Sequence, residues 1–165
     1  MAGKFNLCIQ GNHMEHLSVI RRLCIHLFFV SFLAGCAAPY VVPLKEHASY
    51  TAPGDPNKGI VFIYRESSMM GVLRGIYIKA NGKRVGALNS GTYFVYQADP
   101  GPVTFAAEDW IQGDRTRTLD VEAGKQYYIR GTLSPGVPDV EPRIEIVNDN
   151  EGKEAIKGLR YSTLE

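Results

Sequence analysis

The chain has few of the residues that carry metal and thiol chemistry. Its 165 residues include three cysteines and four histidines. The cysteines are Cys8, Cys24 and Cys36, and His47 is the one histidine beyond residue 36. Residues 37–165 therefore cannot form a disulfide among themselves, and they offer no Cys and His ligand set for structural zinc. We expect no metal site and no cofactor.

A strong charge and a long apolar run are missing as well. The formal net charge is +1, from 18 basic and 17 acidic residues, so the basic excess of a nucleic-acid-binding chain is absent. The apolar run at residues 23–32 contains His26 and Ser31. It is half as long as the stretch of about 20 residues that a transmembrane helix needs. We exclude nucleic acid as a partner, and the short run disfavours a membrane-spanning anchor.

What the chain does have is an ordered leader. Arg21 and Arg22 precede the apolar run, and Leu33-Ala34-Gly35-Cys36 follows it. A positive region, an apolar region and a small-residue site, in that order, are typical of an export signal rather than of a folded segment. Because the site ends on cysteine, it resembles the lipobox of bacterial lipoproteins. A buried core helix is the other reading, which the clustered arginines disfavour.

The resemblance implies a specific modification. The thiol of Cys36 receives a diacylglycerol, a signal peptidase recognises Leu33, Ala34 and Gly35 and cuts before Cys36, and the new amino group is acylated. Residues 1–35 are then the cleaved signal, with Met14 as an alternative start. Two acyl chains are enough for stable membrane attachment.

The same resemblance indicates a location. Ala37, rather than Asp, follows the cysteine, and in the enterobacterial sorting pattern this directs a lipoprotein to the outer membrane, facing the periplasm. The leader holds three of the 18 basic and one of the 17 acidic residues, so the mature chain 36–165 has a net charge of −1.

Residues 36–58 are predicted to be the lipidated cysteine and a flexible tether. The segment contains Pro39, Pro43, Pro53 and Pro56, and proline opposes both helix and central strand. The alternative is that residues 40–44 dock as an edge strand.

Residues 59–165 are predicted to form one domain of short strands and tight turns. Asn81-Gly82 is a strong hairpin signal. Residues 60–65 would be apolar on both faces of a strand, which is typical of a central strand. We expect strands at 60–65, 76–79, 83–88, 93–98, 103–107, 116–121, 126–133 and 143–147. Their spacing predicts an all-β fold, a single antiparallel β-sandwich of seven to eight strands with no parallel sheet. A short helix is expected near 150–159.

The turn and strand motifs also resemble a known group of domains. They are Ile76-Tyr77-Ile78, Asn81-Gly82-Lys83, Val85-Gly86, Gly91-Thr92-Tyr93-Phe94, Asp99-Pro100-Gly101 and the run from Leu119 to Arg130. Together they resemble a family of small bacterial lipoprotein domains of unknown function, over about residues 59–147. More loosely, they are similar to PEGA-type and transthyretin-like surface β-sandwiches. The resemblance implies a fold and a location, and it carries over no catalytic residue.

Catalysis finds little support in the sequence. His47 lies outside the predicted domain, and a Ser-His-Asp site is therefore disfavoured. Glu108, Asp109 and Asp114 flank Trp110, and paired carboxylates beside an aromatic side chain could process a glycan. The simpler reading is a polar loop between strands. We expect no enzyme and no catalytic residue, with a carboxylate-dependent glycan-processing enzyme as the alternative.

A binding surface is the favoured reading, because Trp, Tyr and Arg dominate interaction hot spots. Tyr93 and Tyr127 are expected in the core and Tyr128 on the surface. Met69-Met70 is expected in an exposed loop, either as a partner contact or simply as a mobile segment. The expected partners are the membrane, through Cys36, and an envelope protein or glycan. The candidate binding surface consists of Trp110, Tyr128, Arg130, Arg115 and Arg117.

Overall fold

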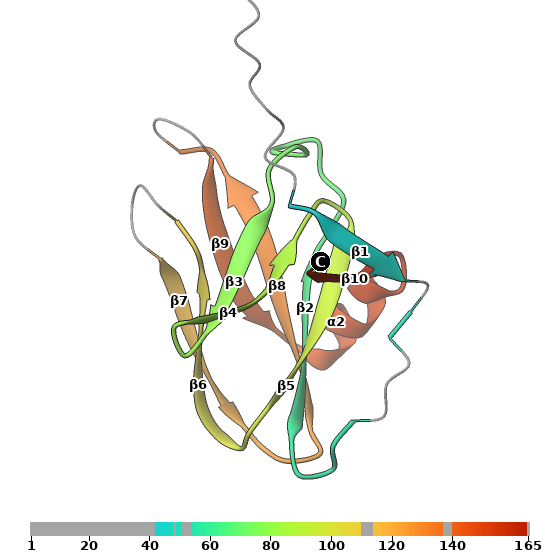
Figure 1. Cartoon of the computed structure of the whole chain (residues 1–165), viewed down its shortest axis with the longest axis vertical. Helices are drawn as coiled ribbons and strands as arrows, with labels where there is room; N and C mark the ends of the chain where they lie inside the picture. The colour runs from blue at the N-terminus through green and yellow to red at the C-terminus, as the bar shows by residue number, and fades with distance from the viewer. Residues whose placement is uncertain (1–41, 48, 51–53, 110–113, 137–139, 165) are drawn as a thin grey trace, which may run out of the picture. The chain divides into compact units, whose positions relative to one another are not determined.

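The computed structural model describes residues 42–47, 49–50, 54–109, 114–136 and 140–164. The predicted signal peptide, Cys36 and Trp110 lie outside these described residues. Ten strands and one helix make up the described fold (Figure 1). They are β1 (Leu44–His47), β2 (Gly59–Arg65), β3 (Ile76–Ala80), β4 (Lys83–Leu88), β5 (Thr92–Ala98), β6 (Gly101–Ala107), β7 (Arg115–Val121), β8 (Gln126–Ser134), β9 (Glu141–Val147), α2 (Asp149–Ile156) and β10 (Arg160–Leu164).

The strands form two sheets. One has six strands in the order β1-β10-β5-β2-β8-β9, and the other has four in the order β4-β3-β6-β7. One hydrophobic core draws on both sheets, with Val61, Ile63 and Ile129 from the first and Ile78 and Phe105 from the second. The mostly β fold and the short C-terminal helix that the sequence predicts are confirmed.

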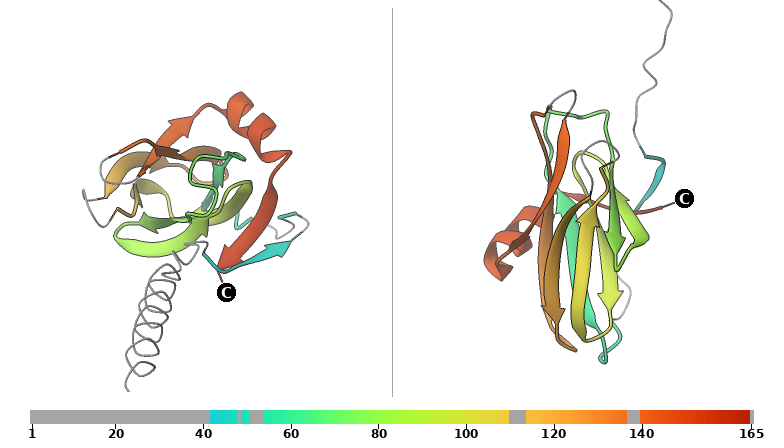
Figure 2. Two further views of the ribbon diagram at one scale, coloured as in Figure 1. Left: turned by 90° about the horizontal axis from the view of Figure 1, so that it is seen from above. Right: turned by 90° about the vertical axis from the view of Figure 1, so that its left-hand side faces the viewer.

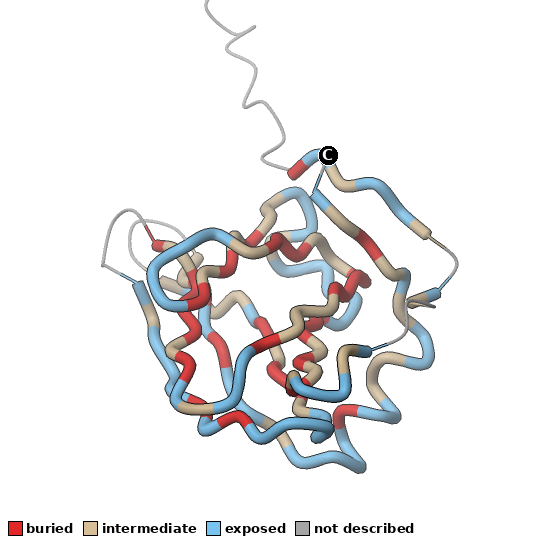
Figure 3. The backbone as a smooth tube through the Cα atoms, turned by 60° about the horizontal axis from the view of Figure 1, so that its bottom comes forward, coloured by how far each residue is buried: buried red, intermediate tan, exposed pale blue. Residues whose placement is uncertain are grey.

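Strand β2 has both faces buried, which explains its unbroken apolar sequence. Val61 and Ile63 belong to the core shared by the two sheets, whereas Phe62 and Tyr64 belong to a second cluster. In the sheet, β2 lies between β5 and β8, as expected of a central strand. Buried residues concentrate on such inner strands and exposed residues on the loops (Figure 3).

The β3–β4 hairpin turns as its sequence predicts. Asn81 has a φ of 48° and Gly82 a φ of 79°, and positive φ at both central residues is the requirement of a type I′ turn. Asn81 also accepts a hydrogen bond from the backbone N–H of Thr104 through its side-chain oxygen, at 2.9 Å, so the turn is tied to β6.

The purely antiparallel architecture is wrong, because the six-stranded sheet is mixed. Strand β2 pairs in parallel with β8, and β10 pairs in parallel with β5. Parallel neighbours need a long crossover. Here strands β3 to β7, rather than a helix, form the connection between β2 and β8.

The chain also has more strands than predicted. The eight expected strands correspond to β2–β9, while β1 and β10 pair antiparallel with each other at the sheet edge. Residues 44–47 of the predicted tether therefore form a strand, slightly downstream of the edge strand considered at 40–44. The side chain of His47 is near that of Thr163, with Nε2 and Oγ1 3.2 Å apart, so the histidine belongs to the fold.

Helix α2 covers a second hydrophobic cluster on the six-stranded sheet. Tyr64, Tyr93 and Tyr128 are its buried members, and Ala155 and Ile156 of the helix pack against it. Figure 2 shows the helix on the outside of the strands. The side chain of Asn148 caps the helix by accepting a hydrogen bond from the N–H of Glu151, a usual N-cap role for asparagine.

The predicted surface position of Tyr128 is therefore wrong. Its side chain is 2% exposed and stacks on Phe62, with ring centroids 5.2 Å apart and planes at 12°. The helix that buries it cannot be inferred from the strand pattern. Tyr93 is buried as expected, and Tyr127 is partly buried against the main core.

Candidate functional site

The structure describes four of the five residues of the predicted binding surface, all except Trp110, and it places them on different strands and in different contacts. Arg130 lies on β8 beside α2, where its two terminal nitrogens pair with Glu145 and Glu151, each at 2.8 Å. These pairs join β8 to β9 and to the helix. The hydrogen bond from Glu145 raises the pKa of Arg130 above its ordinary value. Arg130 is therefore engaged in ion pairs within the domain, and Tyr128 is buried. These two residues of β8 hold the fold together rather than forming an exposed binding surface.

Arg115 and Arg117 lie on β7, in the other sheet. Arg115 pairs with Glu141 at the start of β9, at 3.3 Å, so the edges of the two sheets are linked there. Arg117 is exposed and donates to the carbonyl of Thr116 at 2.8 Å. The two arginines thus share a strand with each other but no surface with Tyr128.

The predicted carboxylates take part in a network of ion pairs. Glu108 receives two nitrogens of Arg84 at 2.8–3.2 Å and lies 4.0 Å from the ammonium of Lys79. Asp114 binds Lys79 at 2.8 Å, and this hydrogen bond lowers the pKa of Asp114 below its ordinary value. Asp109 is buried, and its backbone N–H donates to Asp114. The cluster ties β3 and β4 to the loop after β6.

A feature that the sequence did not reveal lies after β2. The side chain of Arg65 is only 2% exposed, and it donates to the carbonyls of Met70 at 3.0 Å, Gly71 at 2.9 Å and Arg74. Burial lowers the pKa of Arg65 below its ordinary value. One guanidinium therefore fixes the backbone of residues 66–75, which we call the Arg65 loop.

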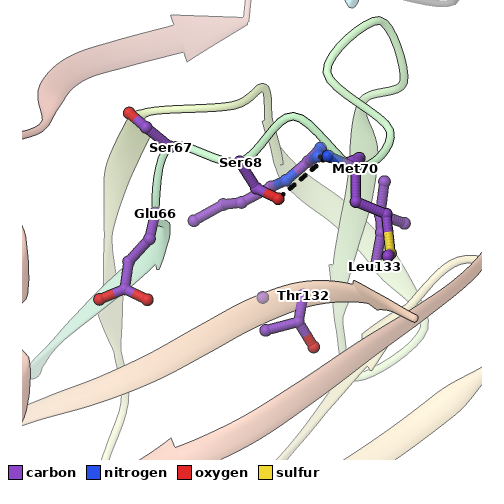
Figure 4. Close-up of a pocket in the computed structure, with 8 residues that line it drawn as sticks. Glu66, Ser67, Ser68, Met70, Thr132 and Leu133 are labelled. Carbon is purple, nitrogen blue, oxygen red and sulfur yellow. Dashed lines mark hydrogen bonds between the residues drawn. The ribbon is translucent and has the colours of Figure 1, made fainter.

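A pocket of about 290 Å³ opens between the Arg65 loop and the end of β8. Figure 4 shows Met70 and Leu133 together at one side and Glu66 at the other. The hydroxyl of Ser68 accepts a hydrogen bond from the N–H of Met70 at 3.2 Å. No histidine or cysteine is among the residues that line the pocket: Arg65, Glu66, Ser67, Ser68, Met70, Gly131, Thr132 and Leu133. The lining combines the carboxylate of Glu66 and the hydroxyls of Ser67, Ser68 and Thr132 with the apolar side chains of Met70 and Leu133.

The Arg65 loop exposes apolar side chains. Met69 is 87% exposed and Leu73 59%, and Met70 and Val72 are exposed too. Four large, exposed apolar side chains within five residues form a local apolar patch, which is a feature of interaction sites. The sequence signal for this feature is Met-Met-Gly-Val-Leu at residues 69–73. No charged residue lies between Glu66 and Arg74.

The Arg65 loop lies beside the start of the described fold. The side-chain amide of Asn89 donates to the carbonyl of Val42 at 2.8 Å and accepts from its N–H at 3.2 Å. A Cβ added to Gly75, at the end of the loop, would lie 2.3 Å from Cγ2 of Val42. Ser68 is bonded to Ser90 of the neighbouring turn. Val42, the loop and the turn at 89–91 therefore form one end of the sandwich.

A comparison with protein families identifies the domain. The model described as "Protein of unknown function (DUF2846)" matches residues 55–142. The chain belongs to this family. The match includes β2 to β8, the Arg65 loop and its pocket, and it ends within β9, before α2 and β10. No curated protein and no solved structure matches the chain.

Two further observations concern the DUF2846 domain and its flanks. Within the part of the chain that the structure describes, no three His, Cys, Asp or Glu side chains are arranged to hold a metal ion. In the same described part, no helix has the length and hydropathy that crossing a membrane requires.

Proposed function

We propose that this protein is a bacterial envelope lipoprotein whose DUF2846 domain is a non-catalytic binding or structural accessory module. In this proposal Cys36 carries the acyl chains, and the domain faces the periplasm from the outer membrane. The observation that carries it is Leu33-Ala34-Gly35-Cys36 behind Arg21, Arg22 and a short apolar run. The domain is proposed to act as PEGA-type and transthyretin-like surface sandwiches do, by presenting loops to a partner.

The described contacts support a module without catalysis. The side chains that most resemble an acid–base set, Glu108 and Asp114, are held by Arg84 and Lys79. The buried cation Arg65 binds backbone carbonyls of its own loop. In contrast, Met69 and Leu73 of the Arg65 loop are exposed, and exposed apolar patches are typical of sites that contact a protein or a membrane. The expected partner is an envelope protein or glycan.

The anchor is tested by intact mass and membrane fractionation of the wild type beside Cys36→Ser. We expect the wild type to carry acyl mass on Cys36 and to sediment with membranes. The serine variant should remain an uncleaved or unacylated species, because the modified thiol is missing. An unacylated wild-type protein in the soluble fraction would overturn the proposal.

The absence of catalysis is tested by complementation of a deletion strain with Glu108→Gln and Asp109→Asn. A carboxylate-dependent glycan-processing enzyme needs a proton donor and a base, and the amides remove them. We expect both variants to restore the envelope phenotype. Thermal melts serve as the control, since Glu108→Gln also weakens the pair with Arg84. A stable variant that fails to complement would favour the enzyme.

A further inference from the structure

The Arg65 loop combines an apolar surface with a fixed backbone. Met69, Met70, Val72 and Leu73 are exposed, while the guanidinium of Arg65 binds three carbonyls of the same loop. A loop that is already ordered loses little conformational entropy when its side chains are buried. The loop is therefore prepared for contact with an apolar phase.

Part of the polar backbone of the loop has hydrogen-bond partners within the domain. In a medium without water an unpaired N–H or C=O group costs several kcal/mol, so most loops cannot approach hydrocarbon. Here the N–H groups of Ser68, Met70, Val72 and Arg74 donate within the domain, and the carbonyls of Ser68, Met69, Met70, Gly71 and Arg74 accept. Residues 67–73 carry no charged side chain, so their desolvation is inexpensive.

The length of the chain before the fold places a membrane within reach. Val42 lies six residues after Cys36 and packs at the base of the Arg65 loop, against Gly75. Since an extended residue spans at most about 3.6 Å, Cys36 can lie no farther than about 22 Å from Val42. An acylated cysteine sits at the surface of the bilayer, so the loop end of the sandwich is held close to it.

We propose that the Arg65 loop inserts Met69, Met70, Val72 and Leu73 into the surface of the phospholipid bilayer that holds the acyl chains of Cys36. This inference rests on the proposed lipid anchor. The loop and the acyl chains form two attachments, and together they orient the domain with the last residue of β2, Arg65, toward the membrane and the first residues of β2 away from it. The turn at 122–125, beside the first residues of β2, then points toward the periplasm.

The test uses the mature acylated protein and one reporter. Cys36 is the one cysteine of residues 36–165, and acylation consumes its thiol, so a cysteine introduced elsewhere is labelled alone. Leu73→Cys places a bimane in the loop, and Ala123→Cys places one in the exposed turn at the far end of β2. Both proteins are reconstituted into vesicles of phosphatidylethanolamine and phosphatidylglycerol. Thermal melts check that each labelled variant is folded.

The proposal predicts opposite quenching at the two positions. The Leu73→Cys label should lose most of its fluorescence to doxyl groups on the acyl chains and little to aqueous iodide. The Ala123→Cys label should behave in the reverse way. If iodide quenches both labels equally while the protein floats with the vesicles, the anchor holds and loop insertion is wrong.

Two other outcomes overturn the inference in distinguishable ways. If the thiol of Cys36 reacts with maleimide and the protein does not float with vesicles, the anchor fails and the inference fails with it. The Leu73→Cys label is also compared between native envelopes and vesicles that contain no other protein. If iodide reaches the label in these vesicles but not in the envelopes, a partner protein rather than lipid covers the loop.

Discussion

Gly152 lies directly on the ring of Tyr128. A Cβ added at Gly152 would be 2.1 Å from Cγ of Tyr128 and 2.4 Å from its Cβ, distances that no side chain can keep. The glycine weakens the helix in isolation, yet it allows α2 to approach β8 closely. Helix, glycine and buried tyrosine are therefore one structural unit.

Gly152→Ala should destabilise the protein. Alanine normally favours a helix over glycine by about 1 kcal/mol, but overpacking a tight contact costs about 1–3 kcal/mol. We expect the clash to win, with a melting temperature lower by several degrees. Thermal melts followed by circular dichroism measure the change.

Gly158→Ala is the matched control. Gly158 follows the same helix, and a Cβ there would meet nothing within 4 Å. This variant should be neutral or slightly stabilising, because alanine has fewer unfolded conformations. Equal loss of stability in both variants would contradict the role assigned to Tyr128.

Arg65→Lys should release the loop that Arg65 holds. Lysine keeps the charge but lacks the planar fork that reaches several carbonyls at once. We expect a loss of about 1.5–3 kcal/mol in the free energy of unfolding, because the carbonyls of the loop lose bonds to a buried, charged donor. Hydrogen exchange should rise at residues 66–75 and stay unchanged in β6 and β7.

Arg117→Lys provides the comparison for that variant. Arg117 is exposed and bonds only the adjacent carbonyl of Thr116 among its described contacts, so its replacement should change stability by less than about 0.5 kcal/mol. If the loop in Arg65→Lys remains as protected as in the wild type, the three carbonyl bonds do not order it.

The sequence predicted the strands that have a pattern of their own. Strands β2 to β9 alternate or run apolar between clear turns, and each could be located from those signals. Strands β1 and β10 carry polar residues such as Lys45, Glu46 and Arg160. They pair with each other, and β10 meets β5 at two positions. Tertiary pairing, which a single sequence does not display, makes them strands.

The candidate site was less predictable for the same reason. Tyr128 and Arg130 do share a face of β8, as the period of two requires, but α2 covers that face. The sequence pattern places Arg65 at the end of the predicted strand 60–65, but it does not show what the side chain of Arg65 binds. Its bonds to carbonyls five to nine residues later depend on the path of the loop. Only the exposed Met69-Met70 pair gave a signal in the sequence.

Tyr64→Phe should stabilise the protein at neutral pH. The side chain is fully buried, and its hydroxyl makes no hydrogen bond to any described residue. Since an unsatisfied buried polar group costs about 1–3 kcal/mol, its removal should raise the free energy of unfolding by about 1 kcal/mol. Urea titration measures this value. A loss of stability would indicate that water bonds the hydroxyl.

Alkaline pH should destabilise the domain through its buried tyrosines. Burial raises the pKa of Tyr64 and Tyr128, and partial burial raises that of Tyr161, above the ordinary value of 10.0. A raised pKa in the folded state means that stability is complete below pH 10 and falls as the pH passes through the folded values. Unfolding by urea between pH 8 and pH 11 should show this decline, with a smaller slope in Tyr128→Phe. If the slope in Tyr128→Phe equals that of the wild type, the ionisation of Tyr128 does not contribute to the alkaline loss of stability.

Asn89→Ala should detach the start of the fold from the loop end of the sandwich. The side-chain amide of Asn89 pairs with both backbone groups of Val42, in the manner of a neighbouring strand. Alanine leaves that N–H and carbonyl without their partner, which costs about 1–3 kcal/mol where the groups stay buried. We expect faster proteolysis at residues 43–58. Asn150→Ala, at an exposed position of α2, should leave the cleavage rate unchanged. Equal cleavage of the wild type and Asn89→Ala would show that the pairing of β1 with β10 suffices to hold the segment.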